Sequence, residues 1–148
     1  MALRLVPNDD SGRRLNPAEP MRLVSEALGY FAQHFSETDA LGRVAATIGT
    51  SDAVLDFSFD QIRGMTPAEA LLDHRLNQLF QSLTVRPRQG LGSAIRACGL
   101  GSTNNVVRQF ETTFGIEMPL FLLTCRRAAE DRLFRQAHPE AEALVLPS

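Results

Sequence analysis

The stretch LGRVAATIGTSDAVLDFSFDQIRG, residues 41–64, decides the fold because it holds two helical segments separated by a short turn. Gly49 and Gly64 are residues that commonly follow the last turn of a helix, and Ser51 is a common N-cap. The sequence therefore predicts two successive helices, the second starting after Ser51 and ending at Gly64. The apolar residues of both helices recur at spacings of three and four: Leu41, Val44, Ala45, Ile48, Leu55, Phe59 and Ile62.

The same pattern returns about fifty residues later. LGSAIRACG, starting at Leu91, repeats LGRVAATIG, and STNNVVRQFETTFG, starting at Ser102, repeats the segment after the turn. Phe110 corresponds to Phe59 in this alignment of the two copies. A solenoid needs at least three stacked units, so two copies joined by one helix is the simpler description.

Further helices are predicted outside the two copies. The first starts near Asn16 and Pro17, the connector covers residues 67–84, and the last covers roughly residues 118–134. Alternation with a period of two is absent, which argues against strands. The fold class is therefore all-α with about seven helices. The first helix carries an apolar stripe at Met21, Val24, Leu28, Phe31 and Phe35, and the connector carries one at Leu72, Leu76, Leu79 and Leu83.

Composition favours one compact unit with modest electrostatics. The 148 residues are 44% hydrophobic, enough for one core or for two small cores that share a helix, and we expect one. Residues 1–15 are expected to be an arm or linker, and residues 135–148 a tail. All fifteen cations are arginine, yet the net charge is −2, which argues mildly against tight nonspecific nucleic-acid binding.

The chemistry-bearing residues do not indicate an enzyme. Cys98 and Cys125 lie in apolar helical contexts and are expected to be buried thiols rather than a disulfide or zinc ligands. His34, His74 and His138 lie in unrelated segments, without a nucleophile beside them. No cofactor and no metal is expected. No apolar run is long enough to span a membrane and no signal peptide is recognisable, so we expect a cytoplasmic protein without a membrane partner.

Residues 24–127 resemble the C-terminal DNA-binding domain of AraC/XylS transcription regulators. The resemblance lies in LGRVAATIGTSDAVLDFSF, GMTPAEALLDHRL, IRACGLGSTNNVVRQFETTFG and the later CRR. It implies a domain over residues 16–134, with two homeodomain-like helix-turn-helix subdomains, about 36–66 and about 90–127, joined by the connector. In such an arrangement both reading helices reach successive major grooves. The implied partner is double-stranded promoter DNA, with RNA polymerase and another regulator protein as further candidates.

The second copy carries the residues best suited to reading DNA. Thr103, Asn104 and Asn105 follow the cap Ser102 on the first helical turn, and Arg108 lies one turn further along. Asn can read adenine with two hydrogen bonds, and Arg can contact guanine or phosphate. Simple capping chemistry explains polar residues on a first turn equally well. Arg96 and Arg43 flank the two units and are the further cationic candidates.

The first copy departs from the family pattern. Phe57 and Asp60 stand where the family usually has cations, and Glu111 stands at a commonly basic position in the second copy. Asp56 can accept a hydrogen bond from cytosine N4, but a solvated acidic face also explains Asp52, Asp56 and Asp60. After Gly115 the proline comes one residue later than in GMTP, which leaves the register of the last helix open.

Two functions follow from these residues. The first is a sequence-specific transcription regulator whose second helix-turn-helix reads the major groove. The alternative is a protein-interaction module on the same fold, such as an antiactivator or a partner of another regulator. Acidic residues and Phe57 favour the interaction module, whereas Asn104, Asn105 and Arg108 favour DNA.

Overall fold

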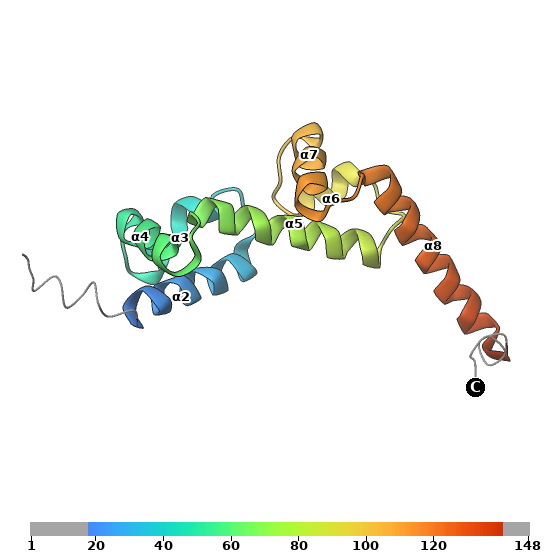
Figure 1. The fold of residues 1–148 in the computed structure, drawn as a ribbon, viewed down its shortest axis with the longest axis horizontal. Helices are drawn as coiled ribbons and strands as arrows, with labels where there is room; N and C mark the ends of the chain where they lie inside the picture. Colours follow the sequence, from blue (N-terminus) through green and yellow to red (C-terminus); the bar gives the residue numbers. More distant parts are fainter. Residues whose placement is uncertain (1–17, 141–148) are drawn as a thin grey trace, which may run out of the picture. The chain divides into compact units, whose positions relative to one another are not determined.

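The structure is a computed structural model that describes residues 18–140, which form seven α-helices and no strand (Figure 1). This confirms the predicted all-α class. The predicted arm and the predicted helix start at Asn16 and Pro17 lie outside the described residues. In the described part of the chain, none of the helices combines the length and the apolar character needed to cross a bilayer. The helices are α2 (Ala18–His34), α3 (Ala40–Ile48), α4 (Asp52–Arg63), α5 (Pro67–Val85), α6 (Leu91–Ala97), α7 (Thr103–Phe114) and α8 (Met118–Ala137).

The chain forms two compact units, and the boundary lies inside α5. Unit 1 ends at His74 and unit 2 starts at Arg75. This differs from the single unit expected from composition. The reason lies in α5, whose Leu71 belongs to the core cluster of unit 1, whereas its later leucines Leu76, Leu79 and Leu83 are buried within unit 2.

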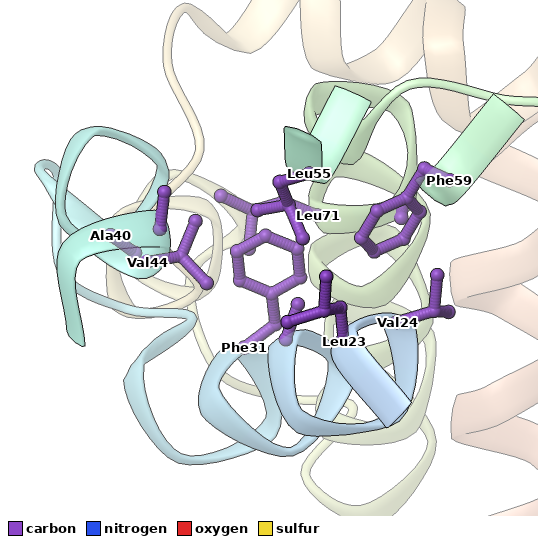
Figure 2. Close-up of a cluster of buried hydrophobic side chains, with 11 residues drawn as sticks. Leu23, Val24, Phe31, Ala40, Val44, Leu55, Phe59 and Leu71 are labelled. Atoms are coloured by element: carbon purple, nitrogen blue, oxygen red, sulfur yellow. The ribbon is translucent and has the colours of Figure 1, made fainter. Parts of the chain in front are cut away.

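Unit 1 is built on α2, which packs against α3 and α4. Figure 2 shows the buried side chains of these helices and of early α5 converging on one cluster, in which Phe31 and Phe59 are fully buried. The predicted α2 stripe is wrong at one end, because Met21 is 55% exposed. Leu23 and Ala27 take part in the core instead, since α2 turns a slightly different face inward than the stripe indicated.

Unit 2 has a core rich in phenylalanine. Phe110 of α7 is fully buried, and its ring lies 4.7 Å from that of Phe114, 5.0 Å from that of Phe121 and 6.1 Å from that of Phe80 between centroids. Cys98 and Cys125 are both buried and free, as predicted. Aromatic pairs at these separations stabilise a core beyond the apolar area that they bury.

Matching caps define α4 and α7. The Ser51 hydroxyl accepts a hydrogen bond from the backbone N–H of Val54 at 3.2 Å, and the Ser102 hydroxyl accepts one from Asn105 at 3.4 Å. Gly64 and Gly115 follow the two helices with φ of 66° and 70°, a left-handed conformation that favours glycine. The predicted caps and stops of both helices are thus confirmed.

The last helix starts differently from α5. In α5 the side chains of Thr66 and Glu69 each accept a hydrogen bond from the other's backbone N–H, a capping box, and Pro67 is the first helical residue. In α8 the proline, Pro119, is the second helical residue. The carboxylate of Glu111 in α7 accepts a hydrogen bond from the backbone N–H of Met118 at 2.9 Å. A carboxylate from the preceding helix therefore replaces the local box, and α8 extends three residues past its predicted end at 134.

Candidate nucleic-acid interface

The polar residues predicted on the second copy form one exposed surface on α7. Thr103, Asn104 and Asn105 occupy the first turn after the Ser102 cap, and Arg108 lies one turn later. All four side chains are exposed, while Val106 and Phe110 face the core. The helix therefore has an apolar inner face and a polar outer face, and the named residues are free of packing constraints.

Asn105 and Arg108 are linked on this surface. The Nη2 of Arg108 donates a hydrogen bond to the Oδ1 of Asn105 at 2.9 Å. This contact restricts the position of the guanidinium over the first turn of α7. Because a carbonyl oxygen has two lone pairs, Asn105 can still accept a hydrogen bond from a base, and its amide group can donate. The pair can thus both donate and accept hydrogen bonds, and it carries one positive charge.

Two further residues, which were not among the predicted DNA contacts, belong to the same surface. Gln109 follows Asn105 by four residues and Thr112 follows Arg108 by four, and both side chains are exposed. Residues four apart share a face of a helix, so this spacing was the signal that could have found them. Gln, like Asn, can pair with adenine through two hydrogen bonds.

The other predicted cations are divided between the units. Arg96 is exposed on α6 and belongs to unit 2 with α7. Arg43 is exposed on α3 in unit 1, where its Nη1 lies 3.2 Å from the Asp39 carboxylate. Asp56 is exposed on α4, also in unit 1. Of the seven predicted residues, five therefore lie in unit 2 and two in unit 1.

Charge separates sharply between the two units. Residues 18–74 contain three arginines and nine acidic residues, whereas residues 75–140 contain nine arginines and five acidic residues. The net charge of −2 for the whole chain conceals this division. Affinity for nucleic acid comes mainly from cations that neutralise phosphates, so only unit 2 has the charge that such binding needs.

The outer surface of α4 has a different character from that of α7. Val54 and Phe57 are 45% and 47% exposed, and Asp56 and Asp60 are exposed beside them. Neither carboxylate forms a salt bridge with any residue in the range 18–140. The repeat places Phe57 at the position of Arg108 and Val54 at that of Asn105. Apolar side chains therefore occupy in α4 the positions that polar side chains occupy in α7.

An open groove lies on unit 1 between α3, α4 and the start of α5. Its volume is about 500 Å³, and Leu41, Leu55 and Pro67 contribute apolar lining. Asp52 and Asp56 also line it, and they are its only charged lining residues in the described part of the chain. We call this feature the acidic groove. A cation placed there meets carboxylates, whereas a phosphate is repelled.

The remaining chemistry-bearing residues are isolated. Burial raises the pKa of the Cys98 thiol, which favours the unreactive protonated form. Burial lowers the pKa of the His74 imidazole, whose Nε2 has no hydrogen-bond partner within residues 18–140 and whose ring lies 5.3 Å from that of Phe35. Across the same residues, no group of three or more histidine, cysteine or acidic side chains is arranged to hold a metal ion.

Comparisons with models of protein families, with curated proteins and with solved structures found no match to this chain.

Proposed function

We propose that this protein is a sequence-specific DNA-binding transcription regulator of the AraC type, in which α6 and α7 form a helix-turn-helix and α7 reads the major groove. The observation that carries the proposal is the exposed polar surface of α7, with Asn104, Asn105 and Arg108, in the unit that holds most of the arginines. Side chains of these types, projecting from one helix, supply donors, acceptors and positive charge to base edges.

Unit 1 has a different part in this proposal. Its α3 and α4 repeat the sequence of α6 and α7, but its outer surface is acidic and apolar. Carboxylates near phosphates weaken binding, so we assign base recognition to unit 2 alone. The expected result is modest affinity, because few cations carry it, and this affinity falls as salt rises with a slope set by the number of phosphate contacts.

Selection from random duplexes tests the proposal and does not require the promoter to be identified first. The full chain is incubated with random duplexes in 50 mM salt, bound duplexes are sequenced, and the enriched site is titrated by fluorescence anisotropy at 50 and 200 mM salt. Arg108→Ala is expected to weaken binding to that site by about tenfold to a hundredfold, since one good bidentate contact contributes ~1–3 kcal/mol. Failure to enrich any sequence contradicts the proposal.

The internal repeat supplies a matched control. Phe57→Ala removes the side chain at the α4 position that corresponds to Arg108. The affinity for the selected duplex is expected to change less than about twofold, because no cation or hydrogen-bonding group is lost. Equal losses from both substitutions point instead to a nonspecific effect of changing an exposed helix.

A protein-interaction module is the second candidate, and exposed Val54 and Phe57 are the observation that favours it. Aromatic side chains at the centre of a surface are frequent anchors of protein interfaces. This candidate predicts that no duplex is selected even in 50 mM salt, and that Phe57→Ala abolishes binding to a protein partner while Arg108→Ala does not.

A further inference from the structure

The outer end of α8 matches the acidic groove in chemistry. We call residues 132–135 of α8 the outer segment. The two carboxylates that precede it are paired, Glu130 with Arg88 at 3.1 Å and Asp131 with Arg135 at 3.0 Å. Leu133 and Phe134 are 66% and 52% exposed there, and Arg132 and Arg135 flank them. Two adjacent large apolar side chains in water are costly to leave uncovered unless a partner buries them. The outer segment is therefore an apolar knob bordered by cations.

The acidic groove has the opposite arrangement. Leu41, 39% exposed, and the buried Leu55 provide apolar surface, and the two charged lining residues are the carboxylates Asp52 and Asp56. A volume of about 500 Å³ lies within the range of sites that enclose small ligands, roughly 300–1,000 Å³, so there is room for large apolar side chains. Unit 1 as a whole also attracts cations, since its acidic residues outnumber its arginines.

We infer that the acidic groove binds the outer segment of α8 from a second copy of this chain. Leu133 and Phe134 enter the apolar lining, and Arg132 and Arg135 face Asp52 and Asp56. Arg135 is partly committed, because it pairs with Asp131 at 3.0 Å within its own helix, whereas Arg132 forms no salt bridge among residues 18–140. Charge complementarity of this kind favours one pairing and disfavours like-charged ones.

Association of this kind has a simple closed form. Each copy carries one groove and one outer segment, so a reciprocal exchange between two copies fills both grooves in a twofold dimer. Such a dimer carries two α7 surfaces. The inference concerns self-association and does not depend on the proposed function.

Sedimentation velocity of the full chain, from 1 to 200 µM in 50 mM salt, provides the first measurement. The expected result is a weight-average mass that rises with concentration above the 16.3 kDa of one chain and falls back toward it in 500 mM salt. A single species of monomer mass over the whole concentration range overturns the inference. It does so even if the groove binds a different protein.

A charge exchange between two variants then tests the specific contact. One variant carries Asp52→Lys and Asp56→Lys, and the other carries Arg132→Glu and Arg135→Glu. Each variant alone brings like charges together, so its dissociation constant is expected to rise at least tenfold. An equimolar mixture has both contacts matched again, and it is expected to associate as tightly as the native chain within about threefold. No recovery in the mixture overturns the inference.

Matched controls separate this contact from general effects of charge and folding. Asp60→Lys changes an exposed carboxylate of α4 that does not line the groove, and Leu123→Ser changes an exposed leucine of α8 before the outer segment. Both are expected to associate like the native chain, whereas Leu133→Ser with Phe134→Ser is expected to be monomeric. If the variant with Asp52→Lys and Asp56→Lys loses helicity by circular dichroism, the mixing experiment is repeated with two single variants, Asp56→Lys and Arg132→Glu. Equal effects of controls and test variants overturn the inference.

Discussion

Helices α4 and α7 are equivalent in framework and opposite on their surfaces. Each has twelve residues, starts after a capping serine, ends at a left-handed glycine and buries one phenylalanine completely. Their outer faces differ, with Val54 and Phe57 in α4 at the positions of Asn105 and Arg108 in α7. Folding constrains the caps and the inner face. The outer face carries no such constraint, so two copies of one framework can recognise different molecules.

Truncation of the two equivalent phenylalanines tests whether the units are stable separately. Phe59→Ala and Phe110→Ala are each expected to lower the free energy of unfolding by about 3–5 kcal/mol, because a large cavity replaces a fully buried ring. Phe110→Ala is expected to cost more, since it also removes contacts with three other rings.

Urea titration distinguishes the units in this experiment. The chain has no tryptophan and one tyrosine, Tyr30 in α2, so tyrosine fluorescence reports on unit 1, while circular dichroism reports on all helices. Phe59→Ala is expected to lower the midpoint of the fluorescence transition, and Phe110→Ala to leave it in place. Equal shifts from both changes mean that the units unfold together.

Cations added to α4 test the assignment of DNA binding to unit 2. Phe57→Arg with Asp60→Arg is expected to raise the affinity for the selected duplex about tenfold in 50 mM salt. Two new phosphate contacts also steepen the dependence of log K on log salt by about 1.8. Glu26→Arg with Ala32→Arg adds the same charge to exposed positions of α2 and serves as the control. If the control gains at least as much affinity for the duplex as the α4 variant does, net charge and not the position on α4 sets the affinity.

The N-termini of α5 and α8, which follow α4 and α7, offer a test with a smaller expected effect. Glu69→Ala and Glu111→Ala each remove a carboxylate that accepts a backbone N–H at 2.9 Å, and each is expected to cost about 1 kcal/mol. Thermal unfolding measures the loss. Amide exchange at Met118 is expected to accelerate in Glu111→Ala and to stay near native in Glu111→Gln, which retains an acceptor. Unchanged exchange in Glu111→Ala contradicts the cap.

The smallest expected effect is the response of unit 1 to pH. Because burial lowers the pKa of His74 in the folded state, the unfolded chain binds its proton first as the pH falls below about 6.5. The stability due to neutral His74 is present above that pH and is lost as the pH falls toward the folded pKa. The melting temperature of His74→Leu is therefore expected to fall less than that of the native chain between pH 7.5 and 5.5. The role given to His74 is wrong if His74→Leu retains the full pH dependence.

Local signals in the sequence predicted much of this fold. The caps at Ser51 and Ser102 and the stops at Gly64 and Gly115 are where they were expected. Cys98 and Cys125 are buried, and α7 presents Asn104, Asn105 and Arg108 outward. The caps and stops depend on residues within about one helical turn, and the apolar spacing along each helix indicates which side faces inward, so a single stretch of chain contains this information.

Other features required packing between distant segments. Met21 fits the apolar stripe of α2, yet it is exposed, whereas Leu23 and Ala27 of the same helix are buried. Glu111 resembles a surface carboxylate in the sequence, but it caps α8 because the fold brings Met118 to it. The acidic groove needs three helices at once, so no single stretch of sequence could indicate it.

The sequence by itself determined the seven helices, the caps of α4 and α7 and the repeat that makes these two helices equivalent, because backbone hydrogen bonding and capping of this kind depend on near neighbours. Only the tertiary structure decided how the leucines of α5 divide between two cores, which apolar side chains stay in water and where carboxylates line a groove. Burial is a property of what lies opposite a side chain, and that partner is distant in sequence.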